Sequence, residues 1–189
     1  HISQAVCQRS NLKAKDGRET VYAYPGDEYR KLIELNTQTA SLVESVLTAG
    51  GLQPDFLTNS IFINILLRNI SPEKHLIADG YPRSLAQAEC FEEAMKFYSR
   101  ERVTIIYMEL SKEEAIKRMK LRGRHDDTEE GINRRFDEYL KNVVPAVNYF
   151  KGKEGYEIYS INGEQTIENV HKDIIKALGH SDSESLQTR

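Results

Sequence analysis

The fold class is decided by one stretch of the chain, His75-Leu76-Ile77-Ala78-Asp79-Gly80-Tyr81-Pro82-Arg83-Ser84. Its first four residues are apolar, with charged residues before them and Asp79-Gly80 directly after them. This pattern is typical of a buried strand in a parallel sheet. Open α/β sheets bind ligands at the carboxyl ends of such strands. The stretch therefore predicts both a fold class and the position of a site.

The remainder of the chain alternates helical and strand patterns in the same way. Further strands are expected at 103–108 and 156–161. Helices are expected from Asn36 to a stop at Ala49-Gly50-Gly51, from Pro54 to Ser71, at 85–99, after the cap Ser111, at 129–150 with a break near Pro145, and at 166–178. Residues 1 to about 35 are polar and Tyr-rich, with turn signals at Asp16-Gly17 and Pro25-Gly26, and no element is predicted there. The order predicts an α/β protein, a three-layer arrangement of a three-stranded parallel sheet flanked by helices.

Composition excludes several classes of protein. The 189 residues carry 26 Lys plus Arg against 29 Asp plus Glu, a formal net charge of -3, so the surface as a whole does not suit nucleic acid. The two cysteines, Cys7 and Cys90, are far apart and form no metal-binding spacing, which favours reduced thiols in the cytoplasm. The richest apolar run, 61–67, is far too short to span a membrane, and no signal peptide is visible.

The turn after the strand at 75–78 carries side chains suited to phosphate and base recognition. Gly80 allows another group to approach the backbone, and Pro82 stiffens the turn. Arg83 offers a planar fork for a phosphate or carboxylate. Gln87 can donate and accept a hydrogen bond at one edge of a base. The alternative is an ordinary strand-to-helix turn with a surface arginine.

Arginines gather in a second region. Arg118 and Arg122 are four residues apart and therefore lie on one face of a helix. Arg124 follows within Gly123-Arg124-His125-Asp126-Asp127, and Arg134 and Arg135 lie on the next helix. Arginines on two helices joined by a short loop can hold a polyphosphate. The alternative is a solvated face on which nearby acids pair with the arginines.

Together these segments resemble the adenylate kinase family of nucleoside monophosphate kinases. The resemblance runs from His1 to about Leu178. His1-Ile2-Ser3 with Arg9 resembles the family's HIS-T-G-D-x-x-R segment, and 49–55 (AGGLQPD) resembles AGxLVPD. Residues 79–87 resemble DGFPRTxxQ, residues 118–127 the RxxxRGR-DD lid, 130–135 and Tyr139 the helix after the lid, and Ile161-Asn162-Gly163 the terminal VDG.

The resemblance implies a role for each matching residue. Arg9 and Arg83 would hold the acceptor phosphate, Gln87 would read the adenine, and the acceptor site would be lined by Gly51, Leu52, Gln53, Gly80, Tyr81 and Pro82. Arg118 and Arg122 would contact the donor triphosphate, and Gln165 the donor base. Arg124 and Arg135 would steady the transferring phosphoryl group, with Arg83 and Arg122 also counted as catalytic. Asp126 and Asp127 would serve lid closure.

The largest departure from the family is an absence. The resemblance implies a P-loop kinase-like fold. In that family the phosphate loop GxPGxGKGT and the first, central strand lie upstream of the segment that begins here at His1. Both are absent from this chain, in which no G-x-x-x-x-G-K-[ST] occurs. The start at His1 without Met favours truncation, and natural loss is the alternative. We expect a gap in the middle of the sheet and no ATP cleavage by this chain.

Three smaller departures concern the acceptor segment and the lid. Gln4-Ala5-Val6 replaces the family's Thr-Gly-Asp, and 11–35 is longer than usual. The lid is very short and has no cysteines, so it binds no zinc. We expect one kinase-like domain at 1–179, with an acceptor-binding insertion at about 10–55 and a lid at about 122–128, followed by a disordered tail at 180–189.

The sequence predicts a monomeric cytoplasmic nucleoside monophosphate kinase that transfers the terminal phosphoryl group of Mg-ATP to AMP, giving ADP. The acceptor can instead be UMP or CMP. A different class of function, a nucleotide-binding module without catalysis, is the other alternative. Neither a nucleic-acid partner nor a membrane is expected, and Mg²⁺ is the one metal implied.

Overall fold

The computed structural model describes residues 17–122 and 128–179. The predicted residues Arg9, Arg124, Asp126 and Asp127 and the predicted tail lie outside these ranges. In chain order the elements are β1 (Thr20–Ala23), α2 (Pro25–Glu34), α3 (Gln38–Thr48), α4 (Asp55–Asn69), β2 (His75–Ala78), α5 (Leu85–Phe97), β3 (Val103–Glu109), α6 (Lys112–Arg122), α7 (Glu129–Glu138), the π-helical turn η1 (Tyr139–Val143), α8 (Val144–Tyr149), β4 (Tyr156–Asn162) and α9 (Ile167–Ala177).

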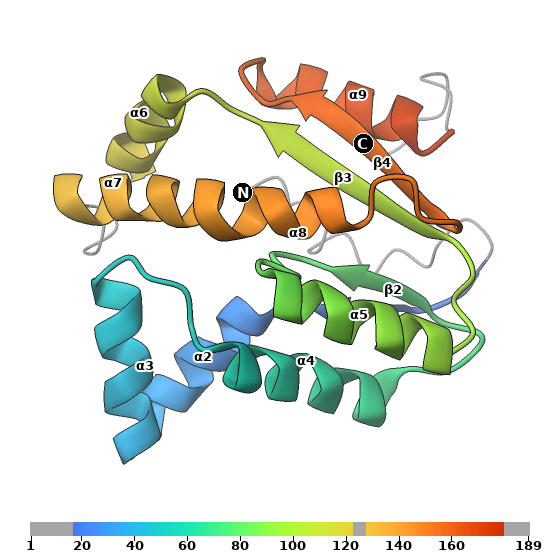
Figure 1. The fold of residues 1–189 in the computed structure, drawn as a ribbon, viewed down its shortest axis with the longest axis horizontal. Helices are drawn as coiled ribbons and strands as arrows, with labels where there is room; N and C mark the ends of the chain where they lie inside the picture. The colour runs from blue at the N-terminus through green and yellow to red at the C-terminus, as the bar shows by residue number, and fades with distance from the viewer. Residues whose placement is uncertain (1–16, 123–127, 180–189) are drawn as a thin grey trace.

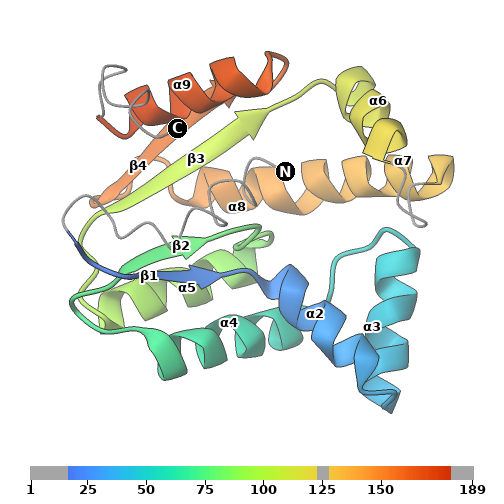
Figure 2. The same ribbon diagram turned by 180° about the vertical axis from the view of Figure 1, so that it is seen from behind.

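The α/β class with parallel strands is confirmed. Within the described ranges the strands form two parallel pairs, β1 with β2 and β3 with β4. The interruption falls between β2 and β3, in the middle of the strand set. Helices α4 and α5 lie along the first pair, while α9 lies on one side of the second pair and α8 on the other (Figure 1). All strands point their carboxyl ends toward α2, α3, α6 and α7 (Figure 2).

The helices begin where side chains can cap them. Thr37, Ser84, Thr128 and Thr166 each accept a hydrogen bond from the backbone N–H three residues further on. Ser111 does the same for α6, as predicted, with Glu114 N donating to its Oγ at 3.3 Å. Such caps satisfy backbone donors that have no partner inside the helix. The helices predicted between residues 36 and 178 are confirmed, with ends shifted by a few residues.

The predicted break near Pro145 is a π-helical turn that precedes the proline. Helix α7 continues through Tyr139–Val143 with π geometry, and α8 then begins at Val144. Pro145 has no N–H to donate to the carbonyl four residues earlier, so the regular ladder is interrupted there. The helical segment therefore changes its winding without ending.

The sequence analysis missed two elements in the first 35 residues. Thr20–Ala23 forms a strand whose partner, His75–Ala78, is about 55 residues away. Pro25-Gly26, expected to be a turn, begins α2, with Pro25 in the first turn of the helix. Proline suits that position because its missing N–H would have no helical partner. The predicted three-stranded sheet is therefore wrong: the described residues hold four strands in two separate pairs.

The strands are also less buried than predicted. Ile77 of β2 is 37% exposed and Met108 of β3 is 47% exposed. A parallel sheet normally has both faces covered. Because the described sheet is divided in the middle, both inner strands keep solvent-accessible side chains.

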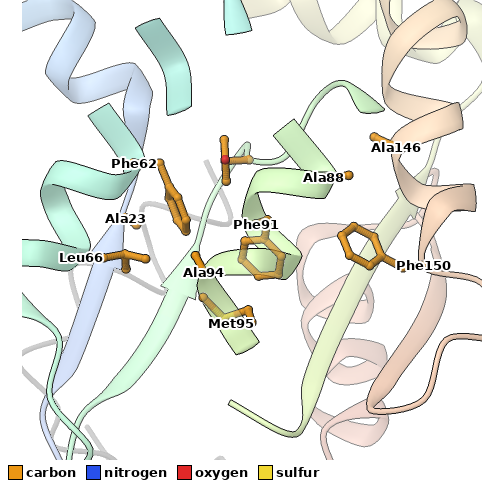
Figure 3. Close-up of a cluster of buried hydrophobic side chains, with 10 residues drawn as sticks. Ala23, Phe62, Leu66, Ala88, Phe91, Ala94, Met95, Ala146 and Phe150 are labelled. Atoms are coloured by element: carbon orange, nitrogen blue, oxygen red, sulfur yellow. The ribbon is translucent and has the colours of Figure 1, made fainter. Parts of the chain in front are cut away.

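The core is a row of aromatic rings that joins the two strand pairs (Figure 3). Tyr81 stacks on Phe62 with ring centroids 4.1 Å apart, and Phe62 lies 5.8 Å from Phe91. Phe91 contacts Phe150 at 6.0 Å, and Phe150 stacks on Tyr156 of β4 at 4.7 Å. Since these rings come from α4, α5, the end of α8, β4 and the turn after β2, they hold the predicted site turn on the core.

Candidate nucleotide-binding site

The turn 79–84 lies at the carboxyl end of β2. The backbone N–H of Asp79 donates to Ala23 O at 2.9 Å, which continues the parallel pairing by one step. The Asp79 carboxylate accepts a hydrogen bond from the hydroxyl of Tyr22 on β1. The start of the turn is thus fixed by the neighbouring strand.

Gly80 is required by the position of the Arg83 side chain. Its φ is +66°, a conformation that favours glycine. A Cβ at this position would come closest to Arg83 Nη2 and would lie 3.2 Å from Cζ. The guanidinium of Arg83 therefore folds back over the backbone of its own turn, in space that any larger residue at position 80 would occupy.

Gln87 is buried beneath this turn, with 2% of its surface exposed. Its Oε1 accepts from the backbone N–H of Arg83 at 2.8 Å, and its Nε2 donates to Asp55 Oδ1 at 2.8 Å. The side chain that the resemblance assigns to base recognition thus also braces the arginine turn. One of its two amide hydrogens has no partner among these bonds.

Two of the residues expected to line the acceptor site face inward. Tyr81 is 5% exposed, and its hydroxyl donates to Asn59 Oδ1 at 2.8 Å. Gln53 is 7% exposed, and its Nε2 donates to Val43 O at 2.8 Å. Both side chains therefore stiffen the walls of this region.

The segment 49–53 is in close contact with α7. Gly50 has a φ of +73°, and a Cβ there would lie 2.6 Å from Gly131 O. Arg134 Nη1 donates to Ala49 O at 3.3 Å. This contact brings Gly51 and Leu52 next to the helix that carries Arg135.

A second match to the family's G-D-x-x-R pattern occurs at Gly26-Asp27-Glu28-Tyr29-Arg30. It follows β1 directly and forms the first turns of α2. Arg30 forms an ion pair with Asp27 and lies with its Cζ 5.5 Å from the centroid of the Tyr24 ring. The sequence analysis overlooked this match, although the motif letters could have revealed it.

Tyr29 ties the start of α2 to α4. It is 8% exposed, and its hydroxyl lies 2.6 Å from Thr58 Oγ1. Burial raises the pKa of this hydroxyl, the Thr58 bond and Arg83 lower it, and Asp55 raises it. Arg83 and Asp55 are therefore close enough to Tyr29 for their charges to act on the pKa of its hydroxyl.

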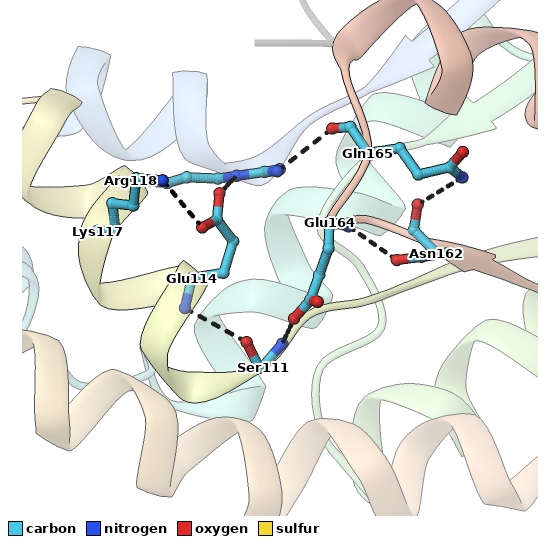
Figure 4. Close-up of polar contacts among 7 residues, drawn as sticks. All are labelled: Ser111, Glu114, Lys117, Arg118, Asn162, Glu164 and Gln165. Carbon is cyan, nitrogen blue, oxygen red and sulfur yellow. Dashed lines mark hydrogen bonds and ion pairs between the residues drawn. The ribbon is translucent and has the colours of Figure 1, made fainter.

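Arg118 and Gln165, which the resemblance assigns to the donor nucleotide, lie together (Figure 4). Arg118 Nη2 donates to Gln165 O at 3.4 Å, and its Nε donates to Glu114 Oε1 at 2.8 Å. The Arg118 bond lowers the pKa of Glu114. The Gln165 amide points elsewhere, with Nε2 donating to Asp173 Oδ2 at 2.6 Å. The residues come from α6 and the loop before α9, about 47 positions apart in sequence.

Two further arginines of the predicted cluster lie on the helices that flank the predicted lid. Arg122 is the last residue of α6, and Arg135 is half-buried on α7. Arg124, Asp126 and Asp127 stand between them in the sequence, outside the described residues. Helices α6 and α7 lie on the side of the molecule toward which the strands point their carboxyl ends (Figure 2).

A cavity on the other side of α2 does not coincide with these residues. It has a volume of about 350 Å³ and lies beside the outer edge of β1, between α2 and α4. Asp27, Glu28, Lys31 and Lys74 line it together with strand residues, and none of the predicted site residues does. We assign the site from the chemistry of the turn and not from this cavity.

Residues 17–122 and 128–179 contain neither a candidate metal site nor a candidate membrane span. No group of three or more His, Cys, Asp or Glu side chains is close enough to hold a metal ion. None of the helices in these ranges is both long and apolar enough to cross a membrane.

Comparisons with known proteins agree with the motifs. A family model described as adenylate kinase matches residues 9–155. An adenylate kinase of Prochlorococcus marinus (strain MIT 9301) is 35% identical over 149 residues, covering 79% of each chain. One of Thermosipho melanesiensis is 28% identical over 184 residues, covering 81% of this chain and 85% of the relative. One of Oenococcus oeni is 32% identical over 144 residues, covering 75% and 76%.

Proposed function

Because the chain belongs to the adenylate kinase family, a family of phosphotransferases acting on nucleoside monophosphates, we propose that it binds AMP at the turn after β2 as the acceptor for a phosphoryl group from ATP. The observation that carries this proposal is the Arg83 guanidinium, which lies over Gly80 at the carboxyl end of a parallel strand. A planar fork there suits the bidentate binding of a phosphate.

We assign the second phosphate arginine of the acceptor site to Arg30, with Arg9 as the alternative. Arg30 follows β1 in the G-D-x-x-R pattern, and Tyr29 beside it is anchored to the same helix as the Arg83 turn. Replacing Arg30 or Arg83 by Ala should each weaken AMP binding about tenfold or more, since hydrogen bonds to charged groups contribute about 1.5–3 kcal/mol. Arg68→Ala, an exposed arginine on α4 that donates to Asn64, is the matched control. If Arg9→Ala weakens binding and Arg30→Ala does not, Arg9 holds the phosphate.

The remaining residues divide between base, donor and transferring group. Gln87 keeps one amide hydrogen for the adenine edge, and Gly51 and Leu52 line the acceptor side. Arg118, Arg122 and Gln165 bind the donor nucleotide. Arg124 and Arg135 neutralise charge on the transferring phosphoryl group, and Asp126 and Asp127 assist lid closure. Phosphoryl transfer depends on alignment and charge neutralisation more than on covalent chemistry, so a set of arginines suits it.

Magnesium would enter with the ATP phosphates. When bound, it neutralises phosphate charge and helps to orient the transferring group. Mg²⁺ is usually held by one or two carboxylates, substrate phosphates and water. Asp79 is the only acid of the turn 79–84 and is the residue that would hold the ion there, directly or through water. The Asp79 carboxylate, fixed by Tyr22, fits this role.

Isothermal titration of this 189-residue chain with AMP, UMP, CMP and Mg-ATP tests the proposal. No G-x-x-x-x-G-K-[ST] occurs in the sequence, so we expect AMP to bind, ATP to bind weakly, and a coupled ADP assay to detect no turnover. Tighter binding of UMP or CMP would reassign the acceptor. Failure of a folded chain to bind any monophosphate would refute the function. We also expect the cytoplasm as its location, in keeping with that of a nucleotide kinase with reduced thiols.

A further inference from the structure

The first turns of α4 contact α2, the turn 79–84 and the start of α5. Thr58 bonds to Tyr29 of α2, and Asn59 accepts from Tyr81. Asp55, the first residue of the helix, is half-buried and faces the turn 79–84. Its Oδ1 accepts from Ser84 Oγ at 2.7 Å and from Gln87 Nε2 at 2.8 Å. The sequence motifs assigned no role to Asp55.

A carboxylate can only accept hydrogen bonds, and this restricts its neighbours. Since Asp55 accepts, Gln87 must turn its NH₂ group toward it and its carbonyl oxygen away. That oxygen accepts from the backbone N–H of Arg83 at 2.8 Å. Ser84 donates its hydroxyl hydrogen to Asp55 and accepts from Gln87 N at 3.2 Å with the same oxygen. The four residues thus form a hydrogen-bonded network in which the Asp55 carboxylate accepts from both Ser84 and Gln87.

This network ends at the backbone N–H of Arg83, whose guanidinium is proposed to bind the phosphate. Ser84 is 9% exposed and Gln87 is 2% exposed, so water is a poor substitute for Asp55 as their acceptor. A buried donor that loses its acceptor moves to find another one. If Asp55 Oδ1 were displaced, Gln87 would shift, and the Arg83 backbone would lose its brace.

We propose that Asp55 is a positioning residue for the acceptor phosphate: its Oδ1 fixes Gln87 and Ser84, and Gln87 in turn holds the Arg83 turn over Gly80. The proposal rests on the proposed function, in which Arg83 binds the phosphate of AMP. It assigns the effect of Asp55 to the position of one oxygen atom and not to the negative charge at the start of α4.

Two conservative substitutions of Asp55 separate the effect of the oxygen position from the effect of the negative charge. Asp55→Asn loses the charge but keeps an oxygen at the position of Oδ1, where both hydrogen bonds end. Asp55→Glu keeps the charge but moves the oxygen by one methylene. We expect the AMP Kd of Asp55→Asn to stay within about threefold of the parent and that of Asp55→Glu to rise about tenfold. Glu168→Gln, which removes an exposed first-turn acid from α9, is the control and should bind AMP like the parent.

Amide hydrogen exchange of the ligand-free chain gives a second readout that a general loss of stability would not reproduce. Protection of the Arg83 amide should fall in Asp55→Glu and persist in Asp55→Asn, while the amides of the β3–β4 ladder keep their protection in both. Equal AMP affinity of Asp55→Glu and the parent, or weaker binding by Asp55→Asn than by Asp55→Glu, would overturn the inference while the proposed function stands. If the parent binds no AMP, the proposed function fails and this inference fails with it.

Discussion

The space above Gly80 allows a direct test of how Arg83 is held. We predict that Gly80→Ala has two separable effects. The first is backbone strain, because a φ of +66° costs an L-residue about 1–2 kcal/mol. The second is displacement of the guanidinium, whose Cζ and Nε would lie 3.2 and 3.3 Å from the new methyl group and whose Nη2 would lie closer still. Non-bonded atoms are most favourably about 3.5–4.0 Å apart, so the fork must move.

The expected change in AMP affinity follows from the hydrogen bonds that the Arg83 guanidinium contributes. Loss of hydrogen bonds from a charged group costs about 1.5–3 kcal/mol, which corresponds to a rise of about 10- to 100-fold in the AMP Kd. Gly152→Ala is the matched control, because its φ is +76° and no atom lies within 4 Å of the position that its methyl group would take. Urea unfolding should show a similar loss of stability for both variants, and titration with AMP should show weaker binding for Gly80→Ala alone.

A double variant completes this test. In an Arg83→Ala background, Gly80→Ala should weaken AMP binding no further, since the displaced group is already absent. Equal AMP affinity for Gly80→Ala and Gly152→Ala would refute the reasoning. So would a full additional loss in the double variant.

Two further predictions concern stability. The hydrogen bond from Lys153, with that from Tyr149, lowers the pKa of Glu92 to about 2, so its stabilisation is complete above about pH 4.5 and is lost as the pH falls toward 2. Glu92→Gln should lower the free energy of unfolding by about 1 kcal/mol at pH 7. The value is modest because the lysine partners are partly solvated. In urea melts the difference in stability between variant and parent should shrink as the pH falls from about 4.5 toward 2. Phe62→Ala, at a fully buried site, should lower the free energy of unfolding by about 3–5 kcal/mol in the same melts. Phe56→Ala on the same helix, where the side chain is 75% exposed, should lower it by less than about 0.5 kcal/mol. Similar losses of stability in the two variants would contradict the assigned packing.

Local patterns sufficed for most elements after residue 36. Helix stops such as Gly50 and caps such as Ser111 act within one or two turns, so they can be read directly from the sequence. Strand β1 could not be found in this way, because four residues become a strand only through pairing with His75–Ala78 far along the chain. Pro25-Gly26 carried a turn signal that is equally compatible with a helix start.

The candidate site likewise combines residues that the sequence could single out with orientations that depend on tertiary contacts. The family resemblance singled out Arg118 and Gln165, and the structure brings them into contact. The inward orientation of Gln53 and the bracing role of Gln87 depend on tertiary acceptors, Val43 O and Asp55 Oδ1, which motif letters do not specify. Arg9 and Arg30 both match the arginine position of the family's segment, and the motif letters alone do not choose between them.

The aromatic row through the core has a consequence for how the chain unfolds. The two described strand pairs share no ladder, so side-chain contacts must couple them, and the contacts of Phe91 with Phe62 and Phe150 are among these. Phe91 thereby helps to couple two potential foldons, cooperative units that could otherwise open with separate free energies. Shortening Phe91 to Leu would weaken this coupling, and the opening free energies reported by the slowly exchanging amides of β2 and β4 would then move apart.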